Sequence, residues 1–157
     1  MQARLNAAAI APEPMKRQVA LEMYLSNHVD HSLKHLVKIR ASQINGCAYC
    51  IDMHTKEARA DGETEQRIYA LSAWRETPFF TDRERAALAW TETVTHISHG
   101  VHDNVFEELQ SQFSEKEIVD LTWAIASINA WNRMAISFRA VPGDYQPGQA
   151  HAAATAS

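Results

Sequence analysis

The chain holds two cysteines, Cys47 and Cys50, and a histidine, His54, follows the second of them by four residues. Two thiols at this spacing can close a small disulfide or share a metal ion. In a helix, a histidine four residues after Cys50 lies on the same face and can exchange a proton with its thiol. These residue types at this spacing therefore indicate thiol redox chemistry.

A helix that begins at Cys47 would favour a reactive thiolate. Asn45-Gly46 is a breaker that predicts the end of one helix and the start of the next. Free N–H groups and the helix dipole stabilise a thiolate in a first helical turn. The spacing makes Cys50 the thiol that His54 can deprotonate and Cys47 its resolving partner. This set suits hydroperoxide reduction, in which a thiolate opens the weak O–O bond and a second thiol captures the sulfenic acid.

Other interpretations of the cysteine pair stay open. Two cysteines on a core helix can be inert packing residues. The pair and His54 could also bind zinc if another histidine supplied a fourth ligand. The candidates for that ligand are His31, His35 and His99. A c-type haem site is excluded because Ile51 follows Cys50, and no βαβ pattern of a thioredoxin fold surrounds the pair.

Length and composition favour one soluble globular domain. Of 157 residues, 46% are apolar and 22% are charged, and the formal net charge of −4 offers no basic surface for nucleic acid. No apolar run approaches the roughly 18 residues that cross a bilayer, so no membrane partner is expected. Residues 1–14 lack the layout of a signal peptide, so we expect a reducing, cytoplasmic setting.

The pattern along the chain predicts a single all-α domain, a bundle of about six to seven helices. Breakers are rare in the middle of the chain, and apolar residues there recur near the 3.6-residue period. We expect the domain at residues 15–141, an irregular arm at 1–14 and a flexible tail at 142–157. The predicted helices span residues 15–27, 31–44, 47–60, 63–74, 81–97, 102–113 and 114–139.

The last and longest predicted helix, residues 114–139, is apolar on several sides. Such a helix is expected at the centre of a bundle or in a subunit interface. Its Trp123 is accordingly predicted to anchor the core or an interface. The other tryptophans, predicted in the same role, are Trp74, Trp90 and Trp131.

Residues 36–54 (LVKIRASQINGCAYCIDMH) head an ordered set of motifs. The shorter members of the set are residues 62–67, 74–80, 83–92 and 128–133. Together they span roughly residues 30–140, and they are far more specific than a Cys-x-x-Cys pair alone. On this set the chain resembles the alkylhydroperoxidase D-like (AhpD-like) branch of the carboxymuconolactone decarboxylase family.

The resemblance implies an all-α, obligately oligomeric protein, a homo-oligomer that could be a trimer, hexamer or dimer. It implies that Cys50 is the peroxidatic cysteine, Cys47 the resolving one and His54 part of a proton relay. The implied activity is that of an antioxidant peroxidase acting on organic hydroperoxides. The implied partner is a dithiol reductant protein or a small thiol, and we expect no cofactor and no metal ion.

One position departs from the family pattern. Family members often carry a glutamate twelve residues before the first cysteine, and His35 occupies that position here. A histidine can pass a proton, but it cannot hold His54 electrostatically as a carboxylate would. We therefore treat His35 as a relay candidate beside Glu92 and Asp52. The alternative functions are a redox-sensing or zinc-binding protein without turnover and a carboxymuconolactone decarboxylase-like enzyme.

Overall fold

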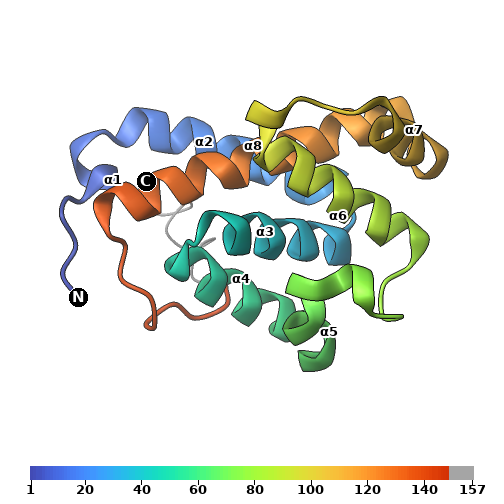
Figure 1. Cartoon of the computed structure of the whole chain (residues 1–157). Coiled ribbons are helices and arrows are strands. Elements are labelled where there is room, and N and C mark those ends of the chain that lie inside the picture. The colour runs from blue at the N-terminus through green and yellow to red at the C-terminus, as the bar shows by residue number, and fades with distance from the viewer. Residues whose placement is uncertain (149–157) are drawn as a thin grey trace.

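Helices make up the fold of the computed structural model, which describes residues 1–148 (Figure 1). That part of the chain holds eight α-helices, two short 3₁₀ helices and no strand, so the predicted all-α class is confirmed. The α-helices are α1 (Ala7–Ile10), α2 (Pro12–His28), α3 (His31–Asn45), α4 (Ala48–Ala60), α5 (Glu65–Ala70), α6 (Asp82–Thr95), α7 (Asp103–Gln112) and α8 (Glu115–Phe138). The 3₁₀ helices are η1 (Leu71–Glu76) and η2 (Ile97–His99).

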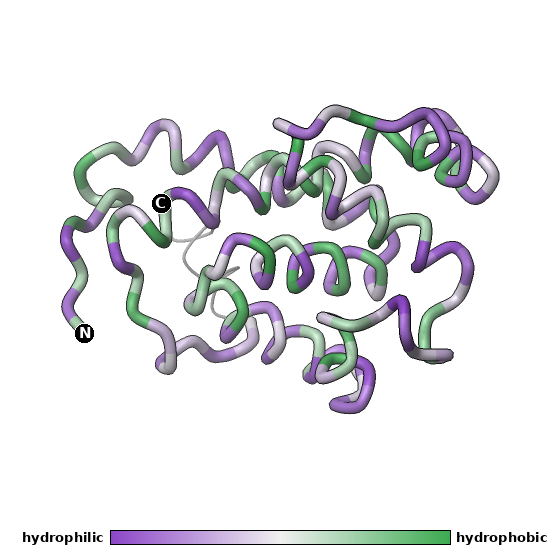
Figure 2. Tube along the Cα trace, viewed as in Figure 1, coloured by the Kyte–Doolittle hydropathy of each residue, from purple (hydrophilic) through white to green (hydrophobic). Residues whose placement is uncertain are grey.

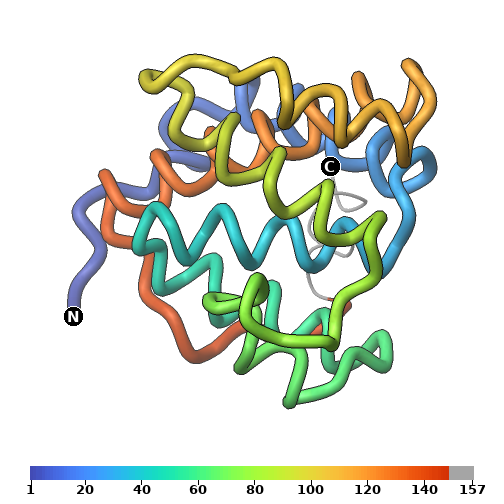
Figure 3. Tube along the Cα trace, turned by 45° about the vertical axis from the view of Figure 1, so that its right-hand side comes forward, coloured from blue at the N-terminus to red at the C-terminus, as the bar shows by residue number. Residues whose placement is uncertain are grey.

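Helix α3 is the central element of the bundle. It contacts α4, α6 and α8, and both views place it between α8 on one side and α4 on the other (Figures 1 and 3). Seven consecutive residues, 33–39, are buried, so every side of the helix faces protein. The buried stretch includes Lys34, His35 and Lys38. The central helix therefore carries polar groups into the interior, where they need partners.

Helix α8 contacts α2, α3, α4, α6 and α7, but one of its sides is exposed, so the bundle does not enclose it and the subunit-interface alternative of the prediction stays open. Its Trp123 is 54% exposed, and Val119, Met134 and Ile136 are exposed as well. Trp123 is therefore no core anchor of the single chain, whereas Trp74 and Trp90 are buried as predicted. Apolar residues on several sides of α8 mark an exposed apolar face here, and its role in a subunit interface remains a proposal.

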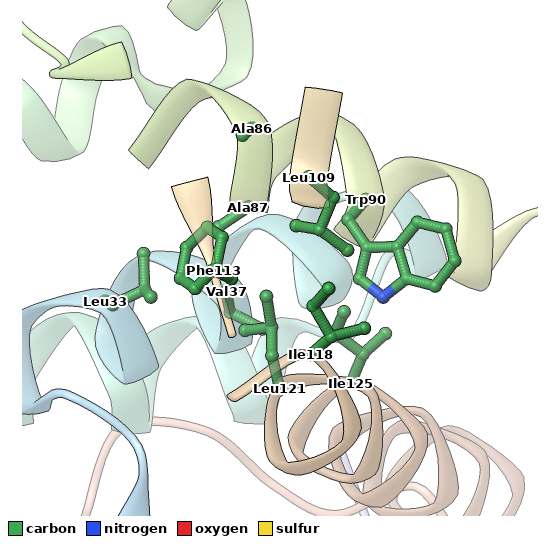
Figure 4. Packing of buried hydrophobic residues seen from close by; sticks show 10 residues of the cluster. All are labelled: Leu33, Val37, Ala86, Ala87, Trp90, Leu109, Phe113, Ile118, Leu121 and Ile125. Atoms are coloured by element: carbon green, nitrogen blue, oxygen red, sulfur yellow. The ribbon is translucent and has the colours of Figure 1, made fainter. Parts of the chain in front are cut away.

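The largest buried cluster joins four helices. Ten apolar residues meet there, nine from α3, α6, α7 and α8 and one, Phe113, directly after α7 (Figure 4). They are Leu33, Val37, Ala86, Ala87, Trp90, Leu109, Phe113, Ile118, Leu121 and Ile125. Trp90 satisfies its indole N–H with Thr122 Oγ1 at 2.9 Å. Removal of this apolar surface from water is the main stabilisation of the bundle.

Local capping signals place the ends of several helices. Thr81 and Glu84 form a capping box at α6, and Ser114 and Glu117 form one at α8. Helix α2 begins at Pro12, earlier than predicted. Proline suits the first position of a helix, because the backbone N–H that it lacks would have no partner there. The short α1 lies in the stretch expected to be irregular.

Hydrophilic residues interrupt the hydrophobic ones along the helices (Figure 2). Within residues 1–148 no helix combines the length and the apolarity that a bilayer crossing requires. The first part of the predicted tail packs on the domain, since Tyr145 is 9% exposed. Its last part, residues 149–157 with His151, lies outside the described residues.

Candidate active site

The turn between α3 and α4 presents the cysteines. Gly46 ends α3 in the left-handed conformation, with φ of 69°, and a side chain there would be strained. Cys47 is the N-cap of α4, and its Sγ accepts a hydrogen bond from the Cys50 N–H at 3.4 Å. The helix break thus lies where the Asn-Gly pair predicts it. Both sulfurs belong to the first turn of α4.

Buried amides of α8 hold this turn in place. Asn45 donates to the Oδ1 atoms of Asn129 and Asn132, at 2.9 Å each. Asn132 in turn donates to Ser42 Oγ at 3.0 Å. Asn132 and Ser42 are fully buried, so these hydrogen bonds are needed to satisfy the groups. They lock the end of α3 against α8 and so fix the position of Cys47.

Cys47 and Cys50 are joined as a disulfide, with their Cα atoms 5.4 Å apart. This separation is normal for a disulfide. Both cysteines are buried, and a cavity of about 790 Å³ reaches Cys50. Cys50 and His54 line this cavity together with Tyr49 and Met53, and Cys47 is not among its lining residues. Cys50 is therefore the cysteine on the cavity side.

A carboxylate fixes the imidazole of His54. His54 is 3% exposed, and its Nδ1 lies 2.9 Å from Oε2 of Glu57, one turn further along α4. The other oxygen of Glu57, Oε1, accepts a hydrogen bond of 2.6 Å from the hydroxyl of Tyr145. An ionised Glu57 selects the tautomer in which His54 carries its proton on Nδ1. Nε2, on the opposite side of the ring, is then the basic nitrogen.

Burial and hydrogen bonding act in opposite directions on the pKa of His54 and on that of Glu57. Burial lowers the pKa of His54, and nearby Lys38 adds to the effect, although the hydrogen bond and charge of Glu57 oppose it. Burial alone would raise the pKa of Glu57. Hydrogen bonds from His54 and Tyr145 and the surrounding positive charge outweigh it and lower the pKa of Glu57 to about 2. We assign a neutral imidazole beside a carboxylate at neutral pH.

A second half-buried carboxylate, Glu22 of α2, lines the same cavity. Its Oε2 pairs with the ammonium of Lys38, and its Oε1 accepts from the hydroxyl of Ser127 and, at 3.1 Å, from the indole N–H of Trp131. Burial favours the neutral acid, but Lys38 and these hydrogen bonds lower the pKa of Glu22. Glu22 is thus an ionised, fully partnered group.

The three relay candidates predicted from the sequence have other partners than His54, although His35 lines the same cavity as Cys50 and His54. His35 Nε2 is 2.6 Å from Oδ2 of Asp61, the C-cap of α4. Glu92 pairs with Arg40 and Arg75 and accepts from the Trp74 indole. Across residues 1–148, none of the three candidates hydrogen bonds to His54.

Asp52, the remaining candidate, docks the C-terminal segment onto α4. Its Oδ2 accepts from Lys56 Nζ and from the Gly143 N–H, both at 3.0 Å. Lys56 also donates to the carbonyls of Gly143 and Tyr145. These contacts bring Tyr145 to Glu57. Asp52 is therefore linked to His54 only indirectly, through the C-terminal segment that carries Tyr145.

The described residues hold one group of side chains with the spacing of metal ligands. Donor atoms of His31, His35 and Asp61 all lie within 4.8 Å of one another. This set differs from the zinc site considered for Cys47, Cys50 and His54. Asp61 Oδ2 already forms a full hydrogen bond to His35 and lies 3.3 Å from His31 Nδ1. One hydrogen bond and one ion-pair contact to Asp61 hold the three side chains together, and His35 Nδ1 has no hydrogen-bond partner among residues 1–148.

Glu57 is the site residue that the sequence interpretation missed. Its spacing of three residues after His54 on one helix was a usable signal, because such neighbours share a face. Glu22 and Tyr145 had no comparable signal. They lie far from the cysteines in the sequence and reach the site only through the packing of α2 and of the C-terminal segment.

Comparison with known proteins agrees with this architecture. The sequence profile of the carboxymuconolactone decarboxylase family matches residues 12–93. The uncharacterized protein YdfG of Bacillus subtilis (strain 168) is 45% identical over 139 residues, which cover 87% of this chain and 95% of YdfG.

Solved structures resemble the chain over most of its length. The crystal structure of ATU0492 from Agrobacterium tumefaciens has a TM-score of 0.88 and 48% identity, covering 92% of this chain and 100% of that one. ATU0492 is of unknown function and has been suggested to be an antioxidant defence protein AhpD. The debrominase Bmp8 has a TM-score of 0.75 at 22% identity, covering 93% of this chain and 77% of its own, which shows the fold alone. The chain belongs to the carboxymuconolactone decarboxylase family, in its AhpD-like branch.

Proposed function

We propose that this protein is a thiol-dependent peroxidase that reduces organic hydroperoxides with Cys50 and stores the oxidation as the Cys47–Cys50 disulfide. The observation that carries the proposal is the shared cavity wall of Cys50 and His54, with Glu57 holding His54 at Nδ1. A hydroperoxide in the cavity meets the sulfur and the imidazole together. The buried Cys47 stays behind Cys50 as the resolving thiol.

The first step consumes the peroxide. His54 Nε2 takes the proton of the Cys50 thiol, and Glu57 stabilises the imidazolium that forms. The thiolate attacks the outer oxygen of ROOH, so that an S–O bond forms and the O–O bond breaks. The leaving alkoxide takes the proton back from His54 and departs as the alcohol ROH. Cys50 is left as a sulfenic acid.

The second step closes the disulfide and resets the enzyme. The thiol of Cys47 attacks the sulfenic sulfur of Cys50, and water leaves as the S–S bond forms. The joined pair of the structure corresponds to this product. A dithiol reductant, protein or small molecule, then returns two electrons and two protons by thiol–disulfide exchange. No cofactor or metal ion enters the cycle.

The relatives support this proposal to different degrees. ATU0492, at 48% identity, has been suggested to be an antioxidant protein, which agrees with peroxide reduction. Bmp8, named for debromination, has the same fold at 22% identity. We also propose that the chain works as a homo-oligomer, with the exposed apolar face of α8 as its contact surface.

Thiol counting tests the proposal directly. Reduced protein is mixed with cumene hydroperoxide, and free thiols are titrated with a chromogenic disulfide. We expect the loss of two thiols for each peroxide consumed. Cys50→Ser should consume no peroxide, and Cys47→Ser should stop at a sulfenic acid that dimedone traps. Retention of both thiols in the wild-type protein would reject the proposal, and lactone decarboxylation that survives both serine substitutions would favour the decarboxylase alternative.

A further inference from the structure

Lys34 is a buried ammonium on the cavity wall without a carboxylate partner. The residue is 7% exposed, and its Nζ makes one hydrogen bond, of 3.3 Å, to Ser26 Oγ. No acidic side chain of residues 1–148 forms an ion pair with it. Lys38, one turn later on α3, is equally buried but pairs with Glu22. Buried charges are normally paired, so Lys34 lacks the compensation that Lys38 has.

The charges around Lys34 do not replace the carboxylate partner that it lacks. Burial lowers the pKa of Lys34, and the repulsion of Lys38 lowers it further, while more distant Glu57, Glu22 and Asp61 act in the opposite direction. Glu22 is engaged by Lys38, and Glu57 is engaged by His54 and Tyr145. The nearby carboxylates therefore already have partners. An anion that enters the cavity would supply the missing one.

The rest of the cavity suits an apolar chain. Beside Lys34 and Cys50 its wall includes Met15, Val19, Met53 and Met134. A cavity of about 790 Å³ is large enough for a ligand of drug or fatty-acid size. Methionine side chains adapt readily to apolar ligands of varied shape. The cavity wall also carries Glu22, Lys38, Glu57 and Asp61, but each of these has an oppositely charged or hydrogen-bonding partner, so Lys34 is the charge left for a ligand beside the apolar surface.

We propose that the cavity binds amphipathic monocarboxylates, with the carboxylate on Lys34 and the apolar chain along the methionines, so that the preferred substrates are hydroperoxides of fatty acids. The choice of substrate rests on the proposed peroxidase function, whereas the binding of the carboxylate does not. Lys34 takes no part in the reaction and acts as a specificity-determining residue.

Binding to the oxidised, disulfide form tests the subsite without any turnover. Isothermal titration compares octanoate with 1-octanol, which has the same chain and no charge, and with acetate, which has the charge and no chain. We expect octanoate to bind about tenfold more tightly than 1-octanol. Lys34→Met should abolish this difference, and Lys34→Arg should keep it. Lys116→Met, an exposed lysine on α8, is the matched control and should change nothing.

Two results would overturn the subsite. One is equal affinity of the wild-type protein for octanoate and 1-octanol, or a preference that survives Lys34→Met. The other is acetate binding as tight as octanoate binding, which would mean that the apolar wall is not used.

Turnover then tests the substrate class. The reduced protein is given the hydroperoxide of linoleic acid, its methyl ester and cumene hydroperoxide. Lys34→Met should lower kcat/KM about tenfold for the acid and leave the two uncharged peroxides unchanged. Equal losses for all three would contradict a carboxylate contact. If no peroxide is consumed, the peroxidase function fails, while the octanoate measurement still decides the subsite.

Discussion

His54 and Glu57 lie one turn apart on α4, with the imidazole Nδ1 2.9 Å from the carboxylate Oε2. His54 thus has a carboxylate neighbour, although position 35 holds a histidine in this chain. Glu57 belongs to the helix that carries the cysteines, whereas His35 belongs to α3. The proposed proton relay from Cys50 through His54 to Glu57 lies on one helix, and Tyr145, in the segment after α8, donates to its outer end.

Loss of the Glu57 charge should slow the reaction of Cys50 with peroxide. We expect Glu57→Gln to reduce the rate of thiol loss with cumene hydroperoxide about tenfold, and His54→Ala to reduce it about 100-fold. Without the carboxylate, the imidazole is a weaker base and forms less thiolate. The pH profile of Glu57→Gln should therefore shift to higher pH, which a merely structural effect would not cause. Glu65→Gln on α5, whose side chain is 61% exposed, serves as the control.

The unfolding free energy should fall as the solution is acidified. The pKa values of His54 and His35 are lowered in the folded protein from 6.5, so below that pH the unfolded chain binds more protons than the folded one. Their stabilising contribution is complete above pH 6.5 and is lost as the pH falls through the lower folded values. The lowered pKa of Glu57, about 2 against 4.5, acts in the same direction at more acidic pH.

Urea unfolding at several pH values checks this trend. His54→Gln should flatten the dependence below pH 6.5, because one of the two buried titrating rings is gone. Slopes that are identical for the wild-type protein and the variant would contradict the assignment of a neutral, buried His54.

The same substitution should change the unfolding free energy in opposite directions at Lys34 and at Lys38. Lys38→Met leaves the half-buried Glu22 without its counter-charge, so we expect a loss of about 2–3 kcal/mol in unfolding free energy. Lys34→Met removes an ammonium that has no acidic partner and should stabilise the free protein by about 1 kcal/mol. Thermal and urea unfolding measure both. Destabilisation of Lys34→Met by as much as Lys38→Met would mean that Lys34 is paired in solution.

The hydroxyl of Tyr145, which lies outside the helices, should affect the stability of the protein and the pKa of Glu57. Tyr145→Phe removes the 2.6 Å hydrogen bond to Glu57 Oε1 and should cost about 1 kcal/mol of stability. Because one of the groups that lower the pKa of Glu57 is lost, the carboxylate should titrate at a higher pH. NMR titration of the Glu57 side-chain carboxyl follows this change directly. Tyr69→Phe, at an exposed tyrosine, gives the reference.

Substitutions of two tryptophans distinguish a core position from the exposed face of α8. Trp90→Ala, at a 7% exposed position, should cost about 3–5 kcal/mol. Trp123→Ala, at a 54% exposed position, should change the stability of the single chain by well under 1 kcal/mol. Unfolding at low protein concentration and sedimentation at high concentration measure the two effects. A large loss for Trp123→Ala at high concentration alone would locate the oligomer contact at this face.

The helices and the position of the cysteines were predictable because their signals are local. The capping boxes at Thr81 and Ser114 and the break at Gly46 each act within a few residues. The layering of the helices was not predictable in this way. Residues 114–139 look more apolar than residues 31–44, yet α3 is the buried helix, because its lysines and His35 find partners or a cavity inside the protein.

The environment of the site was equally hidden in the sequence. Lys34 and Lys38 have the helical spacing of an ordinary solvated face, and only the fold reveals that both are buried and that one has an acidic partner. Tyr145 stands 88 residues from Glu57, a separation across which no periodicity carries information. His54, by contrast, was identified from its spacing to Cys50 alone.

Cys47 caps α4, and Cys50, His54 and Glu57 follow on the same helix. A tilt of α4 relative to its neighbours therefore moves sulfur, base and carboxylate as one rigid unit and leaves the distances among them intact. The same tilt changes how far they stand from the lysines of α3. Small displacements of the helices should therefore leave the proposed reaction unchanged but alter the choice of ligand. Related chains can diverge in what they accept long before they diverge in how they react.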